Sequence, residues 1–330
     1  ILTYGMTCFT LFWVLLLLWG PSGFLPAFIC SLLWTMHPIH TEVVNTIKSM
    51  DEMLCFFFAL LSMLLFLKYV ERKSLSFFLS GGLAFFLCLI SKETGITFLA
   101  IIPLSIYFFS GAEKRHQVRL ILLLAGLSFA YLGLRWVILH DVQEKISLTG
   151  RLLNNTLNAA PDLFSKYMTI FHILFQYIKL LFYPHPLSCD YNYAVIRIQN
   201  PADASAWGGL ILYSISLAIA LYGFKTKKWY SFAILWYLLS LAPVSNFFFL
   251  NGSTMAERFM YIPSLGFCIL LGVGLMHMAK PKGTVKNDSV LLSNITWHKS
   301  LIVLLLSIST FYALKNFFKK CPLEKQPDHF

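Results

Sequence analysis

Long apolar runs alternate with short polar loops along almost the whole chain. Their centres include Phe56–Leu67, Leu120–Ile138, Leu210–Phe224 and Leu301–Leu314, and about 20 helical residues are enough to cross the hydrocarbon core of a bilayer. A transmembrane barrel would instead show alternating segments of about ten residues, and an open sheet leaves backbone groups unpaired in lipid. The pattern predicts an all-α, polytopic transmembrane helix bundle with about nine spans.

One apolar segment does not fit a simple crossing. Tyr167–Phe182 (YMTIFHILFQYIKLLF) lies between two polar stretches that are both predicted on the same side of the membrane, so it cannot cross the bilayer once. Within it, His172, Gln176 and Lys179 recur with helical spacing, which is typical of a helix lying along the membrane surface. We therefore expect an interfacial helix here, in addition to the spans.

Composition also indicates a membrane protein. Hydrophobic residues make up 58% of the 330 residues and charged residues only 12%, which is outside the range of water-soluble domains. The seven cysteines form no CxxC pair, and no His-rich metal motif accompanies them, so we interpret them as packing residues. No metal site or cofactor is predicted, and the question of a divalent metal stays open.

The formal net charge of +11 lies mainly in loops. Short loops rich in Lys and Arg stay on the cytoplasmic side of a membrane. Four loops of this kind are KYVERK (68–73), EKRHQVR (113–119), KTKK (225–228) and KPKGTVK (280–286). We interpret this charge as setting the orientation and facing anionic lipid heads, so membrane lipid rather than nucleic acid is the expected partner.

Alternation of spans then places the remaining polar stretches on the outer face. These stretches are 37–52, 91–95, 140–207 and 251–263. They hold nearly all the polar residues that are not simple basic anchors. The outer face is therefore predicted to contain any chemistry that the protein performs.

The first outer loop, HPIHTEVVNTIKSMDE (37–52), is the strongest candidate for chemistry. Its ionisable residues are His37, His40, Glu42, Lys48, Asp51 and Glu52. Close charges near a bilayer are costly, and they usually pair or serve a site. We expect Lys48 to neutralise Asp51 and Glu52 within one helical turn, which leaves the Glu42 carboxylate free for a hydroxyl or a cation. The alternative is a polar hairpin in which Asp51 and Glu52 favourably charge the start of the next helix.

Two further outer loops contain charges beside apolar runs. Lys92 and Glu93 interrupt such a run at SKETG, where a salt bridge that fastens the hairpin and a role in binding an anionic ligand are both open. Arg258, close to Glu257 and Tyr261, offers a bidentate fork to a phosphate. The alternative for Arg258 is a membrane anchor paired with Glu257.

The long outer stretch holds hydrogen-bonding and aromatic residues of the kind that carbohydrate sites use. They are Asn154, Asn155, Asp190, Tyr191 and Tyr193. Taken alone, these residues are a weak signal.

Four segments taken together resemble a known family. HPIHTEVVNTIKSMDE, SKETGITFL, the stretch from LLNNTLNAA to FYPHPLSCDYNY, and AERFMYIPSLGFC occur in an order that resembles the membrane portion of the transmembrane-and-tetratricopeptide-repeat proteins. These proteins look like members of the GT-C glycosyltransferase superfamily and are similar to protein O-mannosyltransferases. The resemblance implies a GT-C-like fold. It also implies transfer of a mannose-like sugar from a polyprenyl-phosphate carrier to a protein or glycan acceptor on the extracytoplasmic face.

The resemblance also implies residue roles. Glu42 becomes the leading candidate for an acidic active-site group, and His40 would orient it or contact sugar hydroxyls. Arg258 would bind the carrier phosphate, with Lys92 as an auxiliary. The catalytic pocket would also contain two further carboxylates, Asp51 and Glu52. The other residues on the substrate side would be His37, Glu93, Asn154, Asn155, Asp190, Glu257 and Tyr261.

The resemblance sets expectations for the ends of the chain and for its membrane. Residues 1–316 are expected to form the membrane domain, and 317–330 a short tail where a tetratricopeptide array normally follows. Because the chain begins inside an apolar run at Ile1, we expect the first span and first outer loop of the family to be missing, together with the principal acid of that loop. The fragment alone is then expected to be inactive. The bacterial inner membrane is the expected location, or the endoplasmic reticulum membrane in a eukaryote.

Two other classes of function stay open. A transporter or flippase of a lipid-linked substrate could also gather charges in outer loops, although no paired broken helices in corresponding halves are found. A non-catalytic membrane scaffold is the third possibility.

Overall fold

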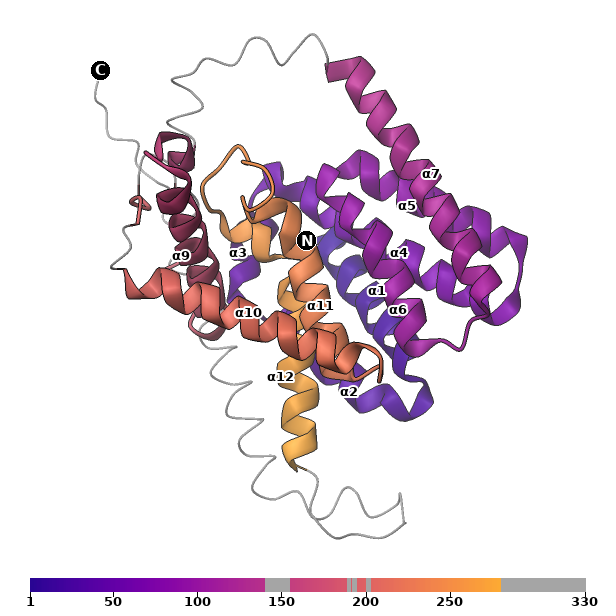
Figure 1. Ribbon diagram of the computed structural model, residues 1–330. Coiled ribbons are helices and arrows are strands. Elements are labelled where there is room, and N and C mark those ends of the chain that lie inside the picture. The colour runs from indigo at the N-terminus through magenta and orange to yellow at the C-terminus, as the bar shows by residue number, and fades with distance from the viewer. Residues whose placement is uncertain (140–154, 189–190, 192–194, 200–202, 280–330) are drawn as a thin grey trace.

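Helices make up the fold. A computed structural model describes residues 1–139, 155–188, 191, 195–199 and 203–279 of the chain. These residues form helices joined by loops and contain no strand, which confirms the predicted all-α class (Figure 1). The α-helices are α1 (Leu2–Trp19), α2 (Phe24–Thr35), α3 (Thr41–Asn45), α4 (Met50–Arg72), α5 (Leu75–Ser91), α6 (Phe98–Phe109), α7 (Lys114–Leu139), α9 (Leu163–Phe182), α10 (Ala204–Phe224), α11 (Trp229–Leu241) and α12 (Ser264–Ala279). The short 3₁₀ segments are η1 (Pro21–Gly23), η2 (Pro38–His40), η3 (Ile47–Ser49), η4 (Glu93–Thr97), η6 (Thr156–Ala159), η7 (Ala242–Val244) and η8 (Glu257–Met260).

Several of the described helices could cross a membrane. Four are long and apolar enough, namely Leu2–Trp19, Ile47–Arg72, Lys114–Ile138 and Ala204–Phe224. A fifth span results if the pair Pro21–Thr35 and Pro38–Asn45, bent by 49°, is one crossing. Four apolar helices are shorter, namely Leu75–Ser91, Glu93–Phe109, Trp229–Val244 and Ser264–His277. The helices support a membrane protein, but they do not confirm the predicted count of about nine spans, and the apolar run 301–314 lies outside the described residues.

Helix α9 contains the segment that is predicted to be interfacial. It is not among the described helices that are apolar enough for a span. It lies against α10 at the edge of the bundle (Figure 1), where His172 Nδ1 and Ser205 Oγ are hydrogen-bonded at 2.7 Å. Its position along the membrane surface stays a prediction.

Two hydrophobic cores hold the helices together. The larger core lies among α1, α2, α4–α7, α11 and α12, and the aromatic rings of Trp34, Phe56, Phe98 and Trp236 contact one another within it. The smaller core joins α9 to α11 and η8, and Tyr177, Tyr237 and Met260 belong to it. Ile39 of η2 and Met260 of η8 belong to the smaller core, so both short segments are anchored by buried apolar side chains.

The hairpin of α4 and α5 separates two ends of the bundle. At one end, α4 begins and α5 terminates, and Lys92 contacts the first turn of α4. At the other end, α4 terminates and α5 begins, and Lys73 contacts Glu113, which precedes α7. We call them the paired end (segments 37–52, 92–97 and 251–261) and the basic end (segments 68–75, 113–119 and 225–228). The loop 225–228 belongs to the basic end because Lys227 Nζ lies 4.6 Å from the centre of the Tyr107 ring, in the last turn of α6.

Candidate functional site

The chain between α2 and α4 forms short helical pieces rather than one helix. Pro38 begins η2, and a residue before proline favours an extended backbone, which His37 adopts at φ −68° and ψ 123°. The chain is extended again at Thr46, where α3 ends. With these two interruptions Glu42 lies in the interior and Asp51 lies in the first turn of α4, an arrangement that one continuous helix could not produce.

The contact between Glu42 and Arg258 joins α3 to η8. Arg258 donates from its main-chain N–H to Glu42 Oε2 at 2.9 Å and from Nη1 to Glu42 Oε1 at 2.8 Å. The Glu42 side chain is 5% exposed and the Arg258 side chain 23%. Arg258 Nη2 also reaches Ser253 Oγ at 3.4 Å. Both carboxylate oxygens of Glu42 are occupied, so the expectation of a free carboxylate is wrong, and the alternative pairing of Arg258 with Glu257 is not observed.

Lys92 joins η4 to the first turn of α4. Its Nζ lies 2.8 Å from Asp51 Oδ2 and 2.7 Å from Glu52 Oε1. Burial lowers the pKa of Lys92, but the nearby carboxylates of Glu52 and Asp51 raise it by more. The pKa of Lys92 therefore lies above its usual value. The prediction that Lys48 neutralises these carboxylates is wrong, because Lys48 lies in η3, outside α4, and is exposed.

An aromatic cluster lies directly below the ion pairs. The His40 ring packs against the rings of Trp34 and Tyr261, with centroids 4.5 and 5.0 Å away. Its Nε2 is hydrogen-bonded with Ser264 Oγ at 2.9 Å, and its Nδ1 with Tyr4 Oη at 3.3 Å. Both ring nitrogens are thus engaged within the protein and the residue is buried, and the expected role of His40 in orienting Glu42 or contacting sugar hydroxyls stays a prediction.

His37 ties the same loop to the end of α9. Its Nε2 is hydrogen-bonded with the carbonyl oxygen of Leu181 at 3.1 Å, and its Nδ1 accepts from the N–H of Ile39 at 3.2 Å. Burial lowers the pKa of His37 to about 4, although the contact with Leu181 opposes this shift. The imidazole is therefore neutral at pH 7 and acts here as a structural link.

The sequence of this chain is similar to those of several curated proteins. The chain is 27% identical over 248 residues to a protein O-mannosyl-transferase of Caenorhabditis elegans, which covers 75% of this chain and 34% of that protein. It is 26% identical over 316 residues to the human protein O-mannosyl-transferase TMTC3, with coverage of 86% and 33%, and 24% identical over 329 residues to human TMTC2, with coverage of 75% and 38%. The resemblance to the TMTC family is confirmed. The chain spans about a third of the length of these curated relatives, and neither a family model nor a solved structure matches it.

Other residues to which the TMTC resemblance assigns roles are placed as parts of the scaffold. Glu257 is buried, and its Oε1 accepts hydrogen bonds from the N–H of Ser188 and from Tyr191 Oη, the latter at 3.2 Å. Tyr261 is fully buried in the aromatic cluster. Both residues therefore support the loop that holds Arg258, and the structure gives no open surface on either for a sugar.

The TMTC resemblance also points to Asn155 and Glu93, which contact residues other than the carboxylates and cations of the Glu42–Arg258 and Lys92 pairs. The buried Asn155 amide donates to Asn246 Oδ1 at 3.1 Å and to the carbonyl oxygen of Asn251 at 2.8 Å. This position fastens two loops together and does not present the amide to a ligand. Glu93 pairs with Arg135 of α7 at 2.8 Å rather than with Lys92. Three further residues singled out in the sequence, Asn154, Asp190 and Tyr193, lie outside the described residues.

Several contacts of the paired end involve residues that the sequence does not single out. Tyr4, Arg135, Ser253 and Ser264 each contact a predicted residue. The contact of Ser253 with Arg258 is local, whereas the other three join segments far apart in the chain. No local sequence motif predicts these long-range contacts. The ionic cluster itself contains two cations, Arg258 and Lys92, and three carboxylates, Glu42, Asp51 and Glu52.

Proposed function

We propose that this chain is the membrane part of a glycosyltransferase that moves a mannose-like sugar from a polyprenyl-phosphate carrier to a protein acceptor on the extracytoplasmic face. The named relatives are protein O-mannosyl-transferases. One observation in the structure supports the proposal most directly. Glu42 fixes the Arg258 guanidinium in a partly open position at the paired end.

The geometry of Arg258 suits the leaving group of such a reaction. Nη1 is committed to Glu42, whereas Nη2 makes only a long contact of 3.4 Å with Ser253 Oγ. A phosphate oxygen is a stronger acceptor than a hydroxyl, because a charged acceptor makes shorter and stronger hydrogen bonds. We propose that the phosphate of the carrier takes the open edge of the guanidinium and that Glu42 acts as a positioning residue for Arg258.

Among the described carboxylates, Asp51 is the best candidate for the proton acceptor. Asp51 shares Lys92 with Glu52, but its side chain is 40% exposed, whereas those of Glu42 and Glu52 are only 5% and 4% exposed. A general base must reach the proton that it removes. In the proposed step, the acceptor hydroxyl forms a bond to the anomeric carbon, the carbon–oxygen bond to the phosphate breaks, Asp51 takes the hydroxyl proton, and Arg258 neutralises the departing phosphate.

The charges of the two ends support the proposed location of the reaction. The basic end fits the cytoplasmic side by the positive-inside rule, and the paired end would then lie on the extracytoplasmic side. The relatives named above are worm and human proteins, and this favours the endoplasmic reticulum membrane over a bacterial inner membrane.

Sugar transfer by the full-length protein tests these roles. Membranes would be supplied with polyprenyl-phosphate mannose carrying a radiolabel, and label in an acceptor protein would be counted. Arg258→Lys keeps the positive charge but loses the two parallel N–H donors of the guanidinium, so we expect about 100-fold slower transfer. Asp51→Asn should slow transfer by about 100-fold or more.

Glu71→Gln is the matched control, since Glu71 forms an exposed ion pair with Lys68 at 3.2 Å in α4. This variant should transfer sugar at the unchanged rate. Insertion into the membrane would be checked for all three variants. Full transfer by both Arg258→Lys and Asp51→Asn would overturn the assigned roles.

A further inference from the structure

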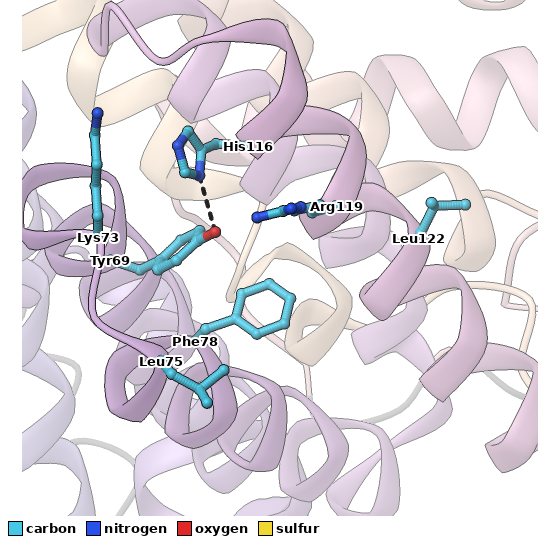
Figure 2. A pocket seen from close by; sticks show the side chains of 7 residues that line it. All are labelled: Tyr69, Lys73, Leu75, Phe78, His116, Arg119 and Leu122. Carbon is cyan, nitrogen blue, oxygen red and sulfur yellow. Dashed lines mark hydrogen bonds between the residues drawn. The ribbon is translucent and has the colours of Figure 1, made fainter.

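A cavity lies at the basic end, far along α4 from the ion pairs. It has a volume of about 450 Å³ and is lined by the last turn of α4, the start of α5 and the first turns of α7 (Figure 2). The lining residues are Tyr69, Lys73, Leu75, Phe78, His116, Arg119 and Leu122. Polar and basic side chains form one side of this cavity and apolar side chains the other.

The basic side of the cavity is held in a defined geometry. Tyr69 Oη is hydrogen-bonded with His116 Nδ1 at 2.9 Å, which ties α4 to α7 (Figure 2). Lys73 terminates α4 in a left-handed conformation with φ 52°, and its N–H donates to the carbonyl oxygen of Tyr69 at 2.7 Å. The guanidinium of Arg119 extends from α7 toward the Tyr69 hydroxyl (Figure 2).

Positive charge at this cavity is only partly balanced among the described residues. The loops KYVERK and EKRHQVR hold six Lys and Arg residues against two Glu residues. Lys73 pairs with Glu113 at 3.3 Å, but both side chains are mostly exposed, and such pairs contribute little. Among the described residues, Arg119 has no ion-pair partner. The first turn of α7 adds the positive end of a helix dipole to this excess, so an anion is the missing partner.

The apolar side of the cavity is continuous with the surface that faces lipid. Leu75 and Leu122 are 67% and 66% exposed, and α7 is one of the helices that could span the membrane. The cavity lies where α4 ends, at the level expected for lipid headgroups. A free phosphate ion would use only the basic side, whereas a phospholipid would use both sides at once.

We infer that this cavity binds one anionic glycerophospholipid. Its phosphate contacts Arg119 and Lys73, and one acyl chain follows Leu75 and Leu122 into the bilayer. Basic pockets between transmembrane helices on the cytoplasmic side are a known means of holding anionic headgroups. The site is separate from the ion pairs of the paired end, so it does not depend on the proposed sugar transfer.

Native mass spectrometry of the purified full-length protein tests this inference. The protein would be released from nanodiscs that contain phosphatidylserine and phosphatidylcholine with identical acyl chains. We expect one phosphatidylserine to be retained with a clear preference over phosphatidylcholine. The double variant Arg119→Gln, Lys73→Gln should bind phosphatidylserine about 30-fold more weakly, since one basic side chain near a membrane surface contributes roughly fivefold.

A control variant with the same loss of charge separates a site from a charged surface. Lys225 and Lys228 lie at the basic end, are exposed, and do not line the cavity. Lys225→Gln, Lys228→Gln should change phosphatidylserine retention by no more than about twofold. Equal losses in both double variants would overturn the inference, as would the absence of any preference in the unmodified protein. Displacement of the lipid by an equal concentration of inorganic phosphate would also overturn it, because the occupant would then be a free ion.

Discussion

The ion pair of Glu42 and Arg258 makes a quantitative prediction. Glu42→Gln removes the negative charge but keeps the shape of the side chain. The amide can accept from only one of the two Arg258 donors, and its own NH₂ group meets the other donor. Removing one partner of a buried ion pair costs about 3–5 kcal/mol. Because 23% of the Arg258 side chain is exposed, water replaces part of the interaction, and we expect a loss of about 3 kcal/mol in the free energy of unfolding.

A double-mutant cycle measures this interaction separately from other effects of substitution. The free energy of unfolding of the full-length protein in mixed micelles would be measured for Glu42→Gln, Arg258→Gln and the double variant. We expect a coupling energy of about 1.5–3 kcal/mol. Lys68 and Glu71 provide the control pair, at 3.2 Å but with side chains 27% and 61% exposed, and their coupling should lie below about 1 kcal/mol.

The proposed role of Glu42 as a positioning residue requires this coupling. If the effects of Glu42→Gln and Arg258→Gln add to within about 0.5 kcal/mol, the two side chains act independently. Glu42 would then not hold Arg258 in position, and its role as a positioning residue would be refuted.

Two further predictions concern other parts of the fold. Because the pKa of His37 falls from 6.5 to about 4 on folding, the unfolded chain takes up a proton first, and the free energy of unfolding should fall by about 3 kcal/mol from pH 6.5 to pH 4. His37→Gln should reduce this slope, and parallel pH curves for the two proteins would contradict the expectation. A Cβ atom at Gly266 would lie 2.5 Å from the carbonyl oxygen of Ala233, so Gly266→Ala should lower the free energy of unfolding by about 1–3 kcal/mol. Gly126→Ala, whose Cβ would have nothing within 4 Å, should change it by less than about 1 kcal/mol, and equal effects of the two substitutions would show that close packing at Gly266 is not the cause.

The fold class and the gathering of polar loops could be predicted from the sequence. Both depend on the alternation of apolar runs and loops, which is a local property of the chain. The number of spans could not be settled in this way, because several helices are short. Helix α6 has only 12 residues and contains Pro103, and the apolar segment around it includes the separate turn η4.

The partners within the candidate site could not be predicted from the sequence. Helical spacing predicts that Lys48 neutralises Asp51 only if both residues lie in one continuous helix. The extended backbone at Thr46 and the turn η3 interrupt that helix. Lys92 takes that role from a loop 40 or more residues away along the chain. The partner of Glu42 is 216 residues away, and no pattern within one segment specifies such a contact.

The two ends of the bundle differ in how their charged side chains are paired. At the paired end the ion pairs are largely buried, whereas at the basic end the pair of Lys73 and Glu113 is mostly exposed. Buried ion pairs are a weak source of stability, because the cost of removing charges from water offsets their attraction. Their effect at the paired end is instead to fix η8 on α3 and η4 on α4, and fixed dipoles and charges are what a reaction with charge development requires. At the basic end, Lys73 has only a mostly exposed pairing with Glu113, and Arg119 has no ion-pair partner among the described residues, which leaves its guanidinium available to the lipid phosphate proposed above. Pairing within the chain at the paired end is thus consistent with the proposed sugar transfer, and excess charge beside an apolar wall at the basic end is consistent with the inferred lipid site.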